Sequence, residues 1–286
     1  MVTIEGLKKQ YGAFALDVSL EIPAGRITGL VGKNGAGKST VIKALLGLIR
    51  PDGGKVTVFG KEAASLLAAD RLKIGTALSN SGFSAYLKLE EVVRILAKFY
   101  PDFNETAFRR ACEEMGLPFG KQLQHYSTGM KAKLRVLTAL CHDAKLLVMD
   151  EPTTGLDVEA RGEVLDSIRR YAAEHEDCSM LITSHIASDL EGLCDDLYLI
   201  HEGKILLHED TDVLLSEYGL LRVDAETYAQ LDPRYLLSRR PEGNGYLCFT
   251  DQKRYYAENY PGILIEKGGI DDLILMMTSA EGRTLQ

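Results

Sequence analysis

The chain of 286 residues carries 33 basic and 41 acidic side chains, which gives a net charge of −8 at pH 7. Binding to nucleic acid needs concentrated Lys and Arg, so this balance argues against a nucleic-acid partner. Hydrophobic residues at 45% and charged residues at 26% are ordinary globular values and do not predict disorder. The two short basic clusters, Arg109-Arg110 and Arg239-Arg240, are expected to be solvated faces.

The five cysteines form neither a C-x-x-C pair nor a metal-ligand spacing. This pattern predicts reduced thiols in a reducing cytoplasm. The sequence has no apolar run that approaches the ~20 residues of a membrane-spanning helix, and we expect no secretory signal at its start. If the protein acts at a membrane, another chain has to supply the membrane part.

The first predicted elements are strands at residues 2–7 and 15–22, followed by a turn at Pro23-Ala24-Gly25 and an apolar strand at 27–31. A helix is predicted to begin at Ser39, because Ser-Thr-Val-Ile-Lys-Ala-Leu-Leu follows there. The turn Pro51-Asp52-Gly53-Gly54 then ends this unit. The N-terminal part is therefore expected to combine an antiparallel β segment with the first strand and helix of a core.

Between the strand at 27–31 and this helix, residues 32–39 read Gly-Lys-Asn-Gly-Ala-Gly-Lys-Ser and fit G-x-x-x-x-G-K-[ST]. Glycines let the backbone wrap a polyphosphate with its N–H groups pointing inward, and the positive end of the helix dipole faces the anion. Lys38 can reach the β- and γ-phosphates, and the Ser39 hydroxyl can ligate Mg²⁺. A plain glycine-rich turn is the alternative, but strand, loop and helix occur together in the required order. The sequence predicts a nucleotide site with candidate residues Asn34, Gly35, Gly37, Lys38, Ser39 and Thr40.

The next region changes from strands to helices. Short strands are predicted at 55–59 and 74–78, and helical spacing of apolar residues predicts helices at 89–100, 105–115 and 130–141. These helices predict a helical insert at about 80–140. The core resumes with a strand at 145–149, a helix at 158–173, a strand at 179–183, a helix at 186–193 and strands at 197–201 and 204–208. Strands that alternate with helices indicate a largely parallel sheet.

Two carboxylates, Asp150 and Glu151, directly follow the apolar strand Leu-Leu-Val-Met. In enzymes with this phosphate-binding loop, a carboxylate at such a strand end holds Mg²⁺. Asp150 fits that role, and Glu151 would lie beside the γ-phosphate, where it can orient and polarise a water molecule. An ordinary strand end with acidic caps is the alternative for the pair on its own.

Three further segments carry a resemblance to a family. They are Tyr-Ser-Thr-Gly-Met at 126–130, Glu-Pro-Thr-Thr-Gly-Leu-Asp at 151–157 and Thr-Ser-His at 183–185. In this order and spacing, residues 1–210 resemble the nucleotide-binding subunit of an ATP-binding cassette (ABC) transporter of the bacterial exporter type. The resemblance implies ATP and Mg²⁺ as cofactors and a head-to-tail dimer with two ATP molecules between the subunits. It also implies catalytic roles for Glu151 and His185, completion of the site in trans by Ser127 and Gly129, an interface position for Asp157 and stacking of Tyr11 on adenine. For Tyr11, a surface aromatic at a strand end stays open as the alternative.

The sequence departs from the family pattern at two places. The usual signature Leu-Ser-Gly-Gly-Gln is replaced by Tyr-Ser-Thr-Gly-Met, which retains Ser127 and Gly129 and is similar to the signature of bacterial exporters of drugs, peptides and lipids. The family's usual Gln after the strand at 74–78, which reaches Mg²⁺, is aligned with Ser79. A serine hydroxyl is too short to span that gap directly, so either a water bridges it or Asn80 takes its place.

The sequence thus predicts an α/β fold: a P-loop ATPase core with a largely parallel sheet, an antiparallel β N-terminal part, a helical subdomain insert and a small α+β C-terminal appendage. The expected domains are an ATPase domain at 1–214 and an accessory domain at 215–286. In the latter we expect strands at 245–250 and 263–266, helices at 251–260 and 270–277, and tyrosines that pack in the core or at an interface.

The resemblance implies an ATPase that powers a separate integral membrane permease from the cytoplasmic face of the cell membrane, with export favoured over import. A second ABC ATPase subunit completes the assembly, and a homodimer is preferred because Glu151, His185, Ser127 and Gly129 are all present. Phe83 and Tyr86 are the expected apolar anchors for the permease. A soluble cassette ATPase that remodels a cytoplasmic assembly is the alternative. A small-molecule kinase is a weaker one, since it leaves Ser-Thr-Gly and Thr-Ser-His unexplained.

Overall fold

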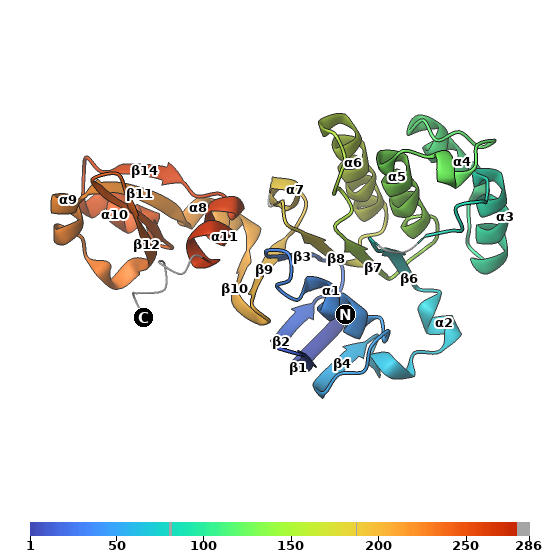
Figure 1. Cartoon of the computed structure of the whole chain (residues 1–286), viewed down its shortest axis with the longest axis horizontal. Coiled ribbons are helices and arrows are strands. Elements are labelled where there is room, and N and C mark those ends of the chain that lie inside the picture. The colour runs from blue at the N-terminus through green and yellow to red at the C-terminus, as the bar shows by residue number, and fades with distance from the viewer. Residues whose placement is uncertain (80–81, 187, 279–286) are drawn as a thin grey trace.

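A computed structural model describes residues 1–79, 82–186 and 188–278. Its central sheet has six strands in the order β10-β9-β3-β8-β7-β6, and all of them run parallel except β10, which pairs antiparallel with β9 (Figure 1). The strands are β3 (Ile27–Val31), β6 (Ile74–Ala77), β7 (Leu146–Asp150), β8 (Ser179–Ser184), β9 (Asp196–His201) and β10 (Lys204–Asp210). The predicted largely parallel sheet is confirmed.

A second, antiparallel sheet lies at the N-terminus with the order β2-β1-β4-β5. Its strands are β1 (Val2–Tyr11), β2 (Phe14–Ile22), β4 (Gly53–Val58) and β5 (Lys61–Glu62). In β2 every second side chain is buried, because a strand with one covered face alternates apolar and polar residues. This sheet and α1 (Lys38–Leu45) pack together on one face of the central sheet.

Both faces of the central sheet are buried, and β7 illustrates this. Leu146 and Val148 contact the core shared with α1 and the N-terminal sheet. Leu147 and Met149 contact the opposite core, which contains α6 (Val158–Glu174) and the apolar residues around the short helix α7 (Ser188–Glu191). A continuous apolar run is the expected pattern for a parallel strand covered on both sides. Because both faces are covered, functional groups have to lie at the strand ends.

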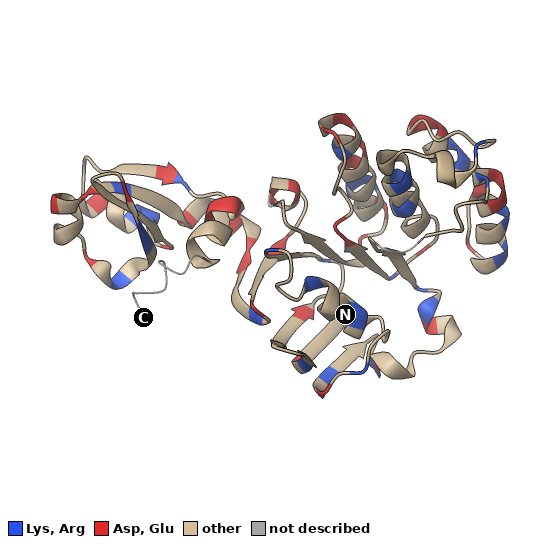
Figure 2. Ribbon diagram, in the orientation of Figure 1, with Lys and Arg blue, Asp and Glu red and all other residues tan. Residues whose placement is uncertain are grey.

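The helical insert between β6 and β7 has a core of its own. It contains α3 (Leu89–Phe99), α4 (Glu105–Glu114), the 3₁₀ turn η2 (Leu123–His125) and α5 (Thr128–Ala139), while η1 (Ala63–Ser65) and α2 (Ala68–Arg71) precede it. Both basic and acidic residues lie on α3 and α4, whereas the charged residues of α5 are all basic (Figure 2). Arg109, for example, forms ion pairs with Glu90 and Glu105, and the described helices include none that is long and apolar enough to cross a membrane.

The chain continues through α8 (Thr211–Glu217) into an antiparallel C-terminal sheet with the order β12-β13-β11-β14. The elements there are β11 (Gly219–Asp224), α9 (Ala225–Gln230), η3 (Pro233–Tyr235), β12 (Leu236–Glu242), β13 (Gly245–Thr250), α10 (Lys253–Asn259), β14 (Leu264–Lys267) and α11 (Ile270–Thr278). One face of this sheet has its own apolar cluster. The other face, with Leu220, Leu247 and Phe249, belongs together with α11 to the core that also contains α6.

Several sequence predictions for individual elements are wrong or incomplete. The helix predicted at 186–193 is short, with α7 confined to Ser188–Glu191, and β11 and β12 were not predicted. The expectation that Arg239 is part of a solvated face is wrong. Its guanidinium lies 4.8 Å from the ring of Tyr228 and 5.3 Å from that of Tyr246. The expected packing role of the tyrosines is confirmed, since Tyr256 is fully buried and five other tyrosines pack against its cluster.

Candidate functional site

The loop between β3 and α1 has the backbone shape that its glycines predict. Gly35 has φ 82° and Gly37, the N-cap residue of α1, has φ 118°. These conformations are in the left-handed region, which favours glycine. A Cβ atom at Gly37 would also lie 2.7 Å from Cδ1 of Leu16. The sequence therefore needs glycine at this position both for the turn and for the close packing of the loop on β2.

A cavity of about 500 Å³ opens above this loop at the carboxyl ends of the central strands. A volume of this size lies within the range of small-molecule sites. Ten of the residues predicted from the sequence line it together: Tyr11, Asn34, Gly35, Gly37, Lys38, Ser39, Thr40, Ser79, Asp150 and Glu151. Phe14 and Lys33 also line it and were not predicted as site residues. The pattern Tyr-Gly-Ala-Phe at 11–14 was the available signal for Phe14, because a tight turn brings its two aromatic ends together.

Lys38 lies in the cavity floor with only 6% of its side chain exposed. Its ammonium donates a hydrogen bond to the carbonyl oxygen of Gly32 at 2.6 Å and forms an ion pair with Oε1 of Glu151 at 3.2 Å. A buried ammonium needs such partners, because burial of an unpaired charge is costly. The Lys38 ammonium is thus held at the N-terminus of α1, and the same helix end attracts a polyphosphate anion.

Three hydroxyl groups converge on the buried carboxylate of Asp150. Oγ of Ser39 donates to Oδ2 at 3.1 Å, Oγ1 of Thr183 donates to Oδ1 at 2.8 Å and Oγ of Ser79 donates to Oδ2 at 3.3 Å. The role of Thr183 was missed, although Thr-Ser-His at 183–185 was recognised. Ser79 reaches this carboxylate directly, and Asn80, the alternative from the sequence, lies outside the described residues.

The oxygen donors of this site fit a hard cation. Mg²⁺ is usually held by one or two protein oxygens, with waters and substrate phosphates as the other ligands. Ser39, Asp150 and Ser79 supply such oxygens beside the phosphate-binding loop. The described residues contain no cluster of three or more His, Cys, Asp or Glu that could hold a metal by themselves.

Glu151 stands in an unusual backbone conformation, with φ 53° directly after β7. Non-glycine residues in this region are uncommon and concentrate at functional sites. Oε2 accepts a hydrogen bond from Thr154 at 2.8 Å and contacts Nδ1 of His185. Burial raises the pKa of the Glu151 carboxyl, but the hydrogen bonds from Thr154 and His185 and the charge of Lys38 outweigh it and hold the pKa below its ordinary value. The carboxylate is therefore ionised and can accept a proton at neutral pH.

The remaining predicted residues lie outside this cavity. Ser127 is the N-cap of α5, and its hydroxyl accepts a hydrogen bond from the backbone of Met130 at 3.1 Å. Gly129 lies in the first turn of the same helix. Asp157 is the N-cap of α6 and accepts from the backbone of Ala160 at 2.8 Å. The structure thus brings His185 to Glu151, but it leaves Ser127, Gly129 and Asp157 at exposed helix starts.

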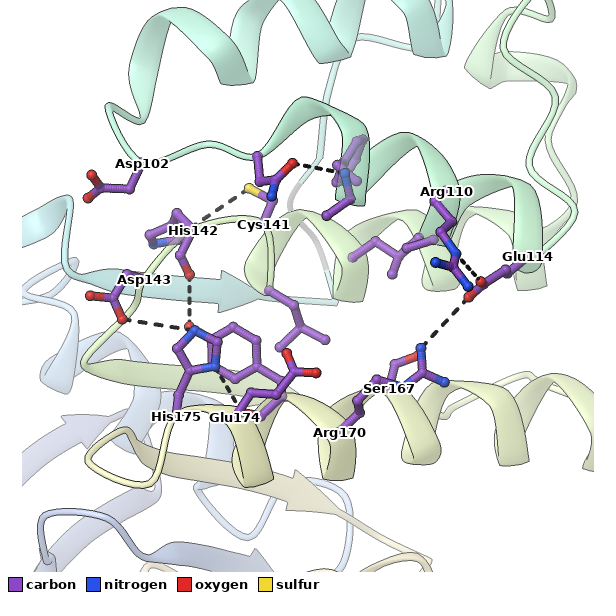
Figure 3. A pocket seen from close by; sticks show the side chains of 17 residues that line it. Asp102, Arg110, Glu114, Cys141, His142, Asp143, Ser167, Arg170, Glu174 and His175 are labelled. Carbon is purple, nitrogen blue, oxygen red and sulfur yellow. Dashed lines mark hydrogen bonds and ion pairs between the residues drawn. The ribbon is translucent and has the colours of Figure 1, made fainter.

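A larger cavity of about 630 Å³ lies elsewhere, between α4, the end of α5 and α6 (Figure 3). Arg110 and Arg170 both form ion pairs with Glu114 there. His142 is stacked on Tyr100 with 4.0 Å between the ring centroids, and burial lowers its pKa to about 4, so it is a neutral packing residue. None of the predicted site residues lines this cavity, so its size does not make it the functional site.

A glycine loop between a buried parallel strand and a helix, a buried lysine and a carboxylate pair on the neighbouring strand together define a P-loop nucleoside triphosphatase.

Comparisons with known proteins extend this class to a family. The model of the family described as ABC transporter matches residues 15–154. Bacitracin transport ATP-binding protein BcrA of Enterococcus faecalis is 33% identical over 210 residues, which cover 72% of this chain and 68% of the relative. Lantibiotic transport ATP-binding protein SrtF of Streptococcus pyogenes is 33% identical over 220 residues, which cover 74% of this chain and 92% of the relative. A solved structure of the ATP-binding subunit of an ABC transporter is 27% identical, with a TM-score of 0.66 over 75% of this chain and 91% of that chain.

The chain belongs to the ABC transporter family, as an ATPase of its ATP-binding subunit type.

Proposed function

We propose that this chain is the ATP-hydrolysing subunit of an exporter, that it pairs head to tail with a second copy, and that the dimer powers a separate integral membrane permease from the cytoplasmic face. Relatives named for bacitracin transport, lantibiotic transport and Nod factor export support export of a peptide, drug or lipid. The permease selects the substrate, so this chain supplies only the energy. Residues 1–214 would form the ATPase domain and residues 215–286 the accessory domain.

In this proposal the residues near the phosphate loop bind ATP, hold Mg²⁺ or act on the attacking water, and Ser39 has two of these tasks. Asn34, Gly35, Gly37, Lys38, Ser39 and Thr40 bind the phosphates of ATP, and Tyr11, 47% exposed at the end of β1, stacks on adenine. Ser39, Asp150 and Ser79 would hold Mg²⁺, and the ion would neutralise part of the phosphate charge. Glu151 orients the attacking water and accepts its proton. His185 is held at the Glu151 carboxylate. From there it donates a hydrogen bond to the γ-phosphate.

The position of the signature residues carries the proposal of a dimer. Ser127 and Gly129 stand at the N-terminus of α5, which is an anion-attracting helix end, yet neither lines the cavity of the phosphate loop in the same chain. A second subunit in head-to-tail orientation can bring this helix end onto the nucleotide. Val158, 88% exposed beside Asp157, is an apolar side chain that such an interface would cover. In a homodimer, each nucleotide site would combine the phosphate loop of one copy with the signature of the other. A homodimer is preferred because both such sites would have all of their catalytic and binding groups.

A mixing experiment tests the trans site. Lys38→Ala damages the phosphate loop and Ser127→Arg damages the signature, so in a mixed head-to-tail dimer one site carries both defects and the other carries neither. Both variants are prepared with Glu151→Gln, so that bound ATP is not consumed. We expect each variant alone to trap no ATP, and the mixture to trap one ATP per mixed dimer, with about half of the dimers mixed. The measurement is bound nucleotide per dimer after size exclusion.

Failure of the mixture to trap nucleotide, while the parent Glu151→Gln protein traps two per dimer, would refute the trans site. Mass measurement of an ATP-bound complex with a different cassette chain would refute the homodimer. Co-purification with a cytoplasmic assembly instead of an integral membrane protein would favour the remodelling ATPase.

The permease is expected to dock beside a second cavity of about 530 Å³, which Ser79, Phe83, Ala85 and residues of α5 line. Phe83 is half buried against the helical core, so its substitution would also disturb folding. Tyr86 is 72% exposed and is the cleaner anchor. A bound amphipathic helix of the permease would cover it.

Tyr86→Asp should therefore reduce permease-stimulated ATP hydrolysis by about tenfold or more, the loss typical of an aromatic anchor, and leave the rate of the isolated subunit unchanged. The measurement is the ATPase rate with and without the permease in lipid vesicles. Leu48→Asp is the matched control, because Leu48 is 59% exposed but lies after α1, away from the helical insert. Equal stimulation of wild type and Tyr86→Asp would remove this surface from the proposal.

A further inference from the structure

Arg135 on α5 makes a contact that the sequence motifs do not explain. Its guanidinium donates a hydrogen bond to the backbone carbonyl of Ser79 at 2.6 Å and has a second, longer contact of 3.4 Å with that of Leu78. Both carbonyls belong to the segment that follows β6. An arginine of the signature helix thus holds the backbone at the position where the family usually has glutamine.

The same serine reaches the carboxylate of the nucleotide site. While its carbonyl accepts from Arg135, its hydroxyl donates to Oδ2 of Asp150 at 3.3 Å. A continuous path of hydrogen bonds runs from α5 through Ser79 to Asp150.

The packing of α5 against β6 determines how a tilt of this helix would move the residues of the path. A Cβ atom at Gly75 of β6 would lie 2.3 Å from the carbonyl oxygen of Ala139, so the glycine lets the last turn of α5 lie directly against the central sheet. Arg135 lies four residues before Ala139, about 6 Å along the helix, and Ser127 lies twelve residues before it, about 18 Å. A tilt of α5 about its fixed end moves Ser127 most and Arg135 by about one third as much.

We propose that Arg135 is a positioning residue that holds the Ser79 hydroxyl on Asp150 and so transmits the orientation of the signature helix to the carboxylate that serves Mg²⁺. The proposal rests on the function proposed above for Asp150 and for the helical insert. It explains how a short serine can act where the family uses a longer glutamine. Serine supplies the contact with the carboxylate, and arginine supplies the reach to the helix.

The cavity lined by Phe83 is the place where a permease segment could act on α5. Ser79 and Arg135 lie in its wall together with Thr128 and Leu134 of the same helix. A permease segment that enters this cavity would press on α5 and on the Ser79 backbone at once. Docking would then change the hold of Ser79 on Asp150 without contact between the permease and the nucleotide.

The test uses the isolated full-length subunit and a fluorescent ATP analogue. The affinity of the subunit for the analogue is measured once in EDTA and once in Mg²⁺. The protein carries Glu151→Gln so that the analogue is not hydrolysed. Arg135→Gln should leave the affinity in EDTA unchanged and reduce the gain in affinity on addition of Mg²⁺ by about tenfold, the effect of losing one hydrogen bond to a charged group. Ser79→Ala should reduce the gain similarly, and the double variant should lose no more than either single variant, because both act on one path.

Two further variants separate positioning from folding. Arg110→Gln is the matched control, because it removes an exposed arginine of the helical insert, and it should keep the full Mg²⁺ response. Arg135→Lys keeps a charged donor and should restore part of that response. A lower unfolding temperature for Arg135→Gln together with an intact Mg²⁺ response would mean that Arg135 is only structural and would overturn the proposal. So would additive losses in the double variant.

The outcome is independent of the permease assignment, because no permease is present. If Arg135→Gln loses its Mg²⁺ response while Tyr86→Asp has no effect on stimulation, the docking surface is wrong and the positioning path stands. The reverse result refutes the path and keeps the docking surface.

Discussion

Glu151→Gln is expected to lower ATP turnover by at least the ~10²-fold at the lower end of general-base contributions. Glutamine keeps the size of the side chain and its hydrogen bond with Thr154, but it cannot accept the proton of the attacking water. Lys38 and Ser39 remain in place, so nucleotide binding should survive. Loss of a negative charge near the γ-phosphate should even tighten the closed dimer. The measurement is single-turnover hydrolysis, with size exclusion to detect an ATP-bound dimer.

The pH profile provides an internal check on this assignment. Because the pKa of the Glu151 carboxyl is held below its ordinary value of 4.5, the base is ionised throughout the neutral range. The wild-type rate should therefore lose this group's contribution only as the pH falls below about 4.5. A Glu151→Gln protein with the wild-type rate would assign the catalytic work to another group, with His185 first in line.

Lys38→Ala is expected to weaken ATP binding by about 10²-fold, since two charge-assisted hydrogen bonds to phosphate are worth roughly 3 kcal/mol together. The structure adds a second consequence. Without the ammonium, the Glu151 carboxylate loses one of the charges that offset its burial, so its pKa should rise. The weaker binding is measured as the dissociation constant of a fluorescent ATP analogue.

Lys43→Ala is the matched control for Lys38→Ala. Lys43 lies on the same helix α1 and is exposed. Its substitution by Ala removes the same charge from the chain without altering the cavity. Its affinity should equal that of the wild type. Equal affinity of Lys38→Ala and wild type would place the phosphates away from the loop at 32–39.

The fold of residues up to about 210 was predictable because its signals are local and redundant. The apolar run before Asp150 defines a doubly buried strand, and the glycines at 35 and 37 both adopt the left-handed backbone that the loop requires. The C-terminal sheet was harder to predict. β12 contains Arg239, Arg240 and Pro241, which resembles a loop, but it is an edge strand where proline is tolerated. The guanidinium of Arg239 lies against two tyrosine rings.

The candidate site was predictable where residues adjoin a motif and unpredictable where contacts arise from tertiary packing. Lys38, Ser39, Asp150 and Glu151 follow strands whose carboxyl ends meet, so their convergence follows from topology alone. The contact between Arg135 and the Ser79 carbonyl joins segments 56 residues apart, and no spacing rule predicts it. Such contacts depend on the angle at which α5 crosses β6, which a single sequence does not specify.

The C-terminal sheet and the ATPase core share one apolar interior. Phe249 and Leu273 are buried in the same cluster as Ile168 and Leu190, and the backbone N–H of Ile270 donates to Glu191 of α7 at 2.9 Å. Removal of either part would expose apolar surface of the other. The boundary proposed at 214–215 therefore separates tasks and not folding units, so heat should melt both parts in a single cooperative transition, and a shortened chain should be prone to aggregation and proteolysis.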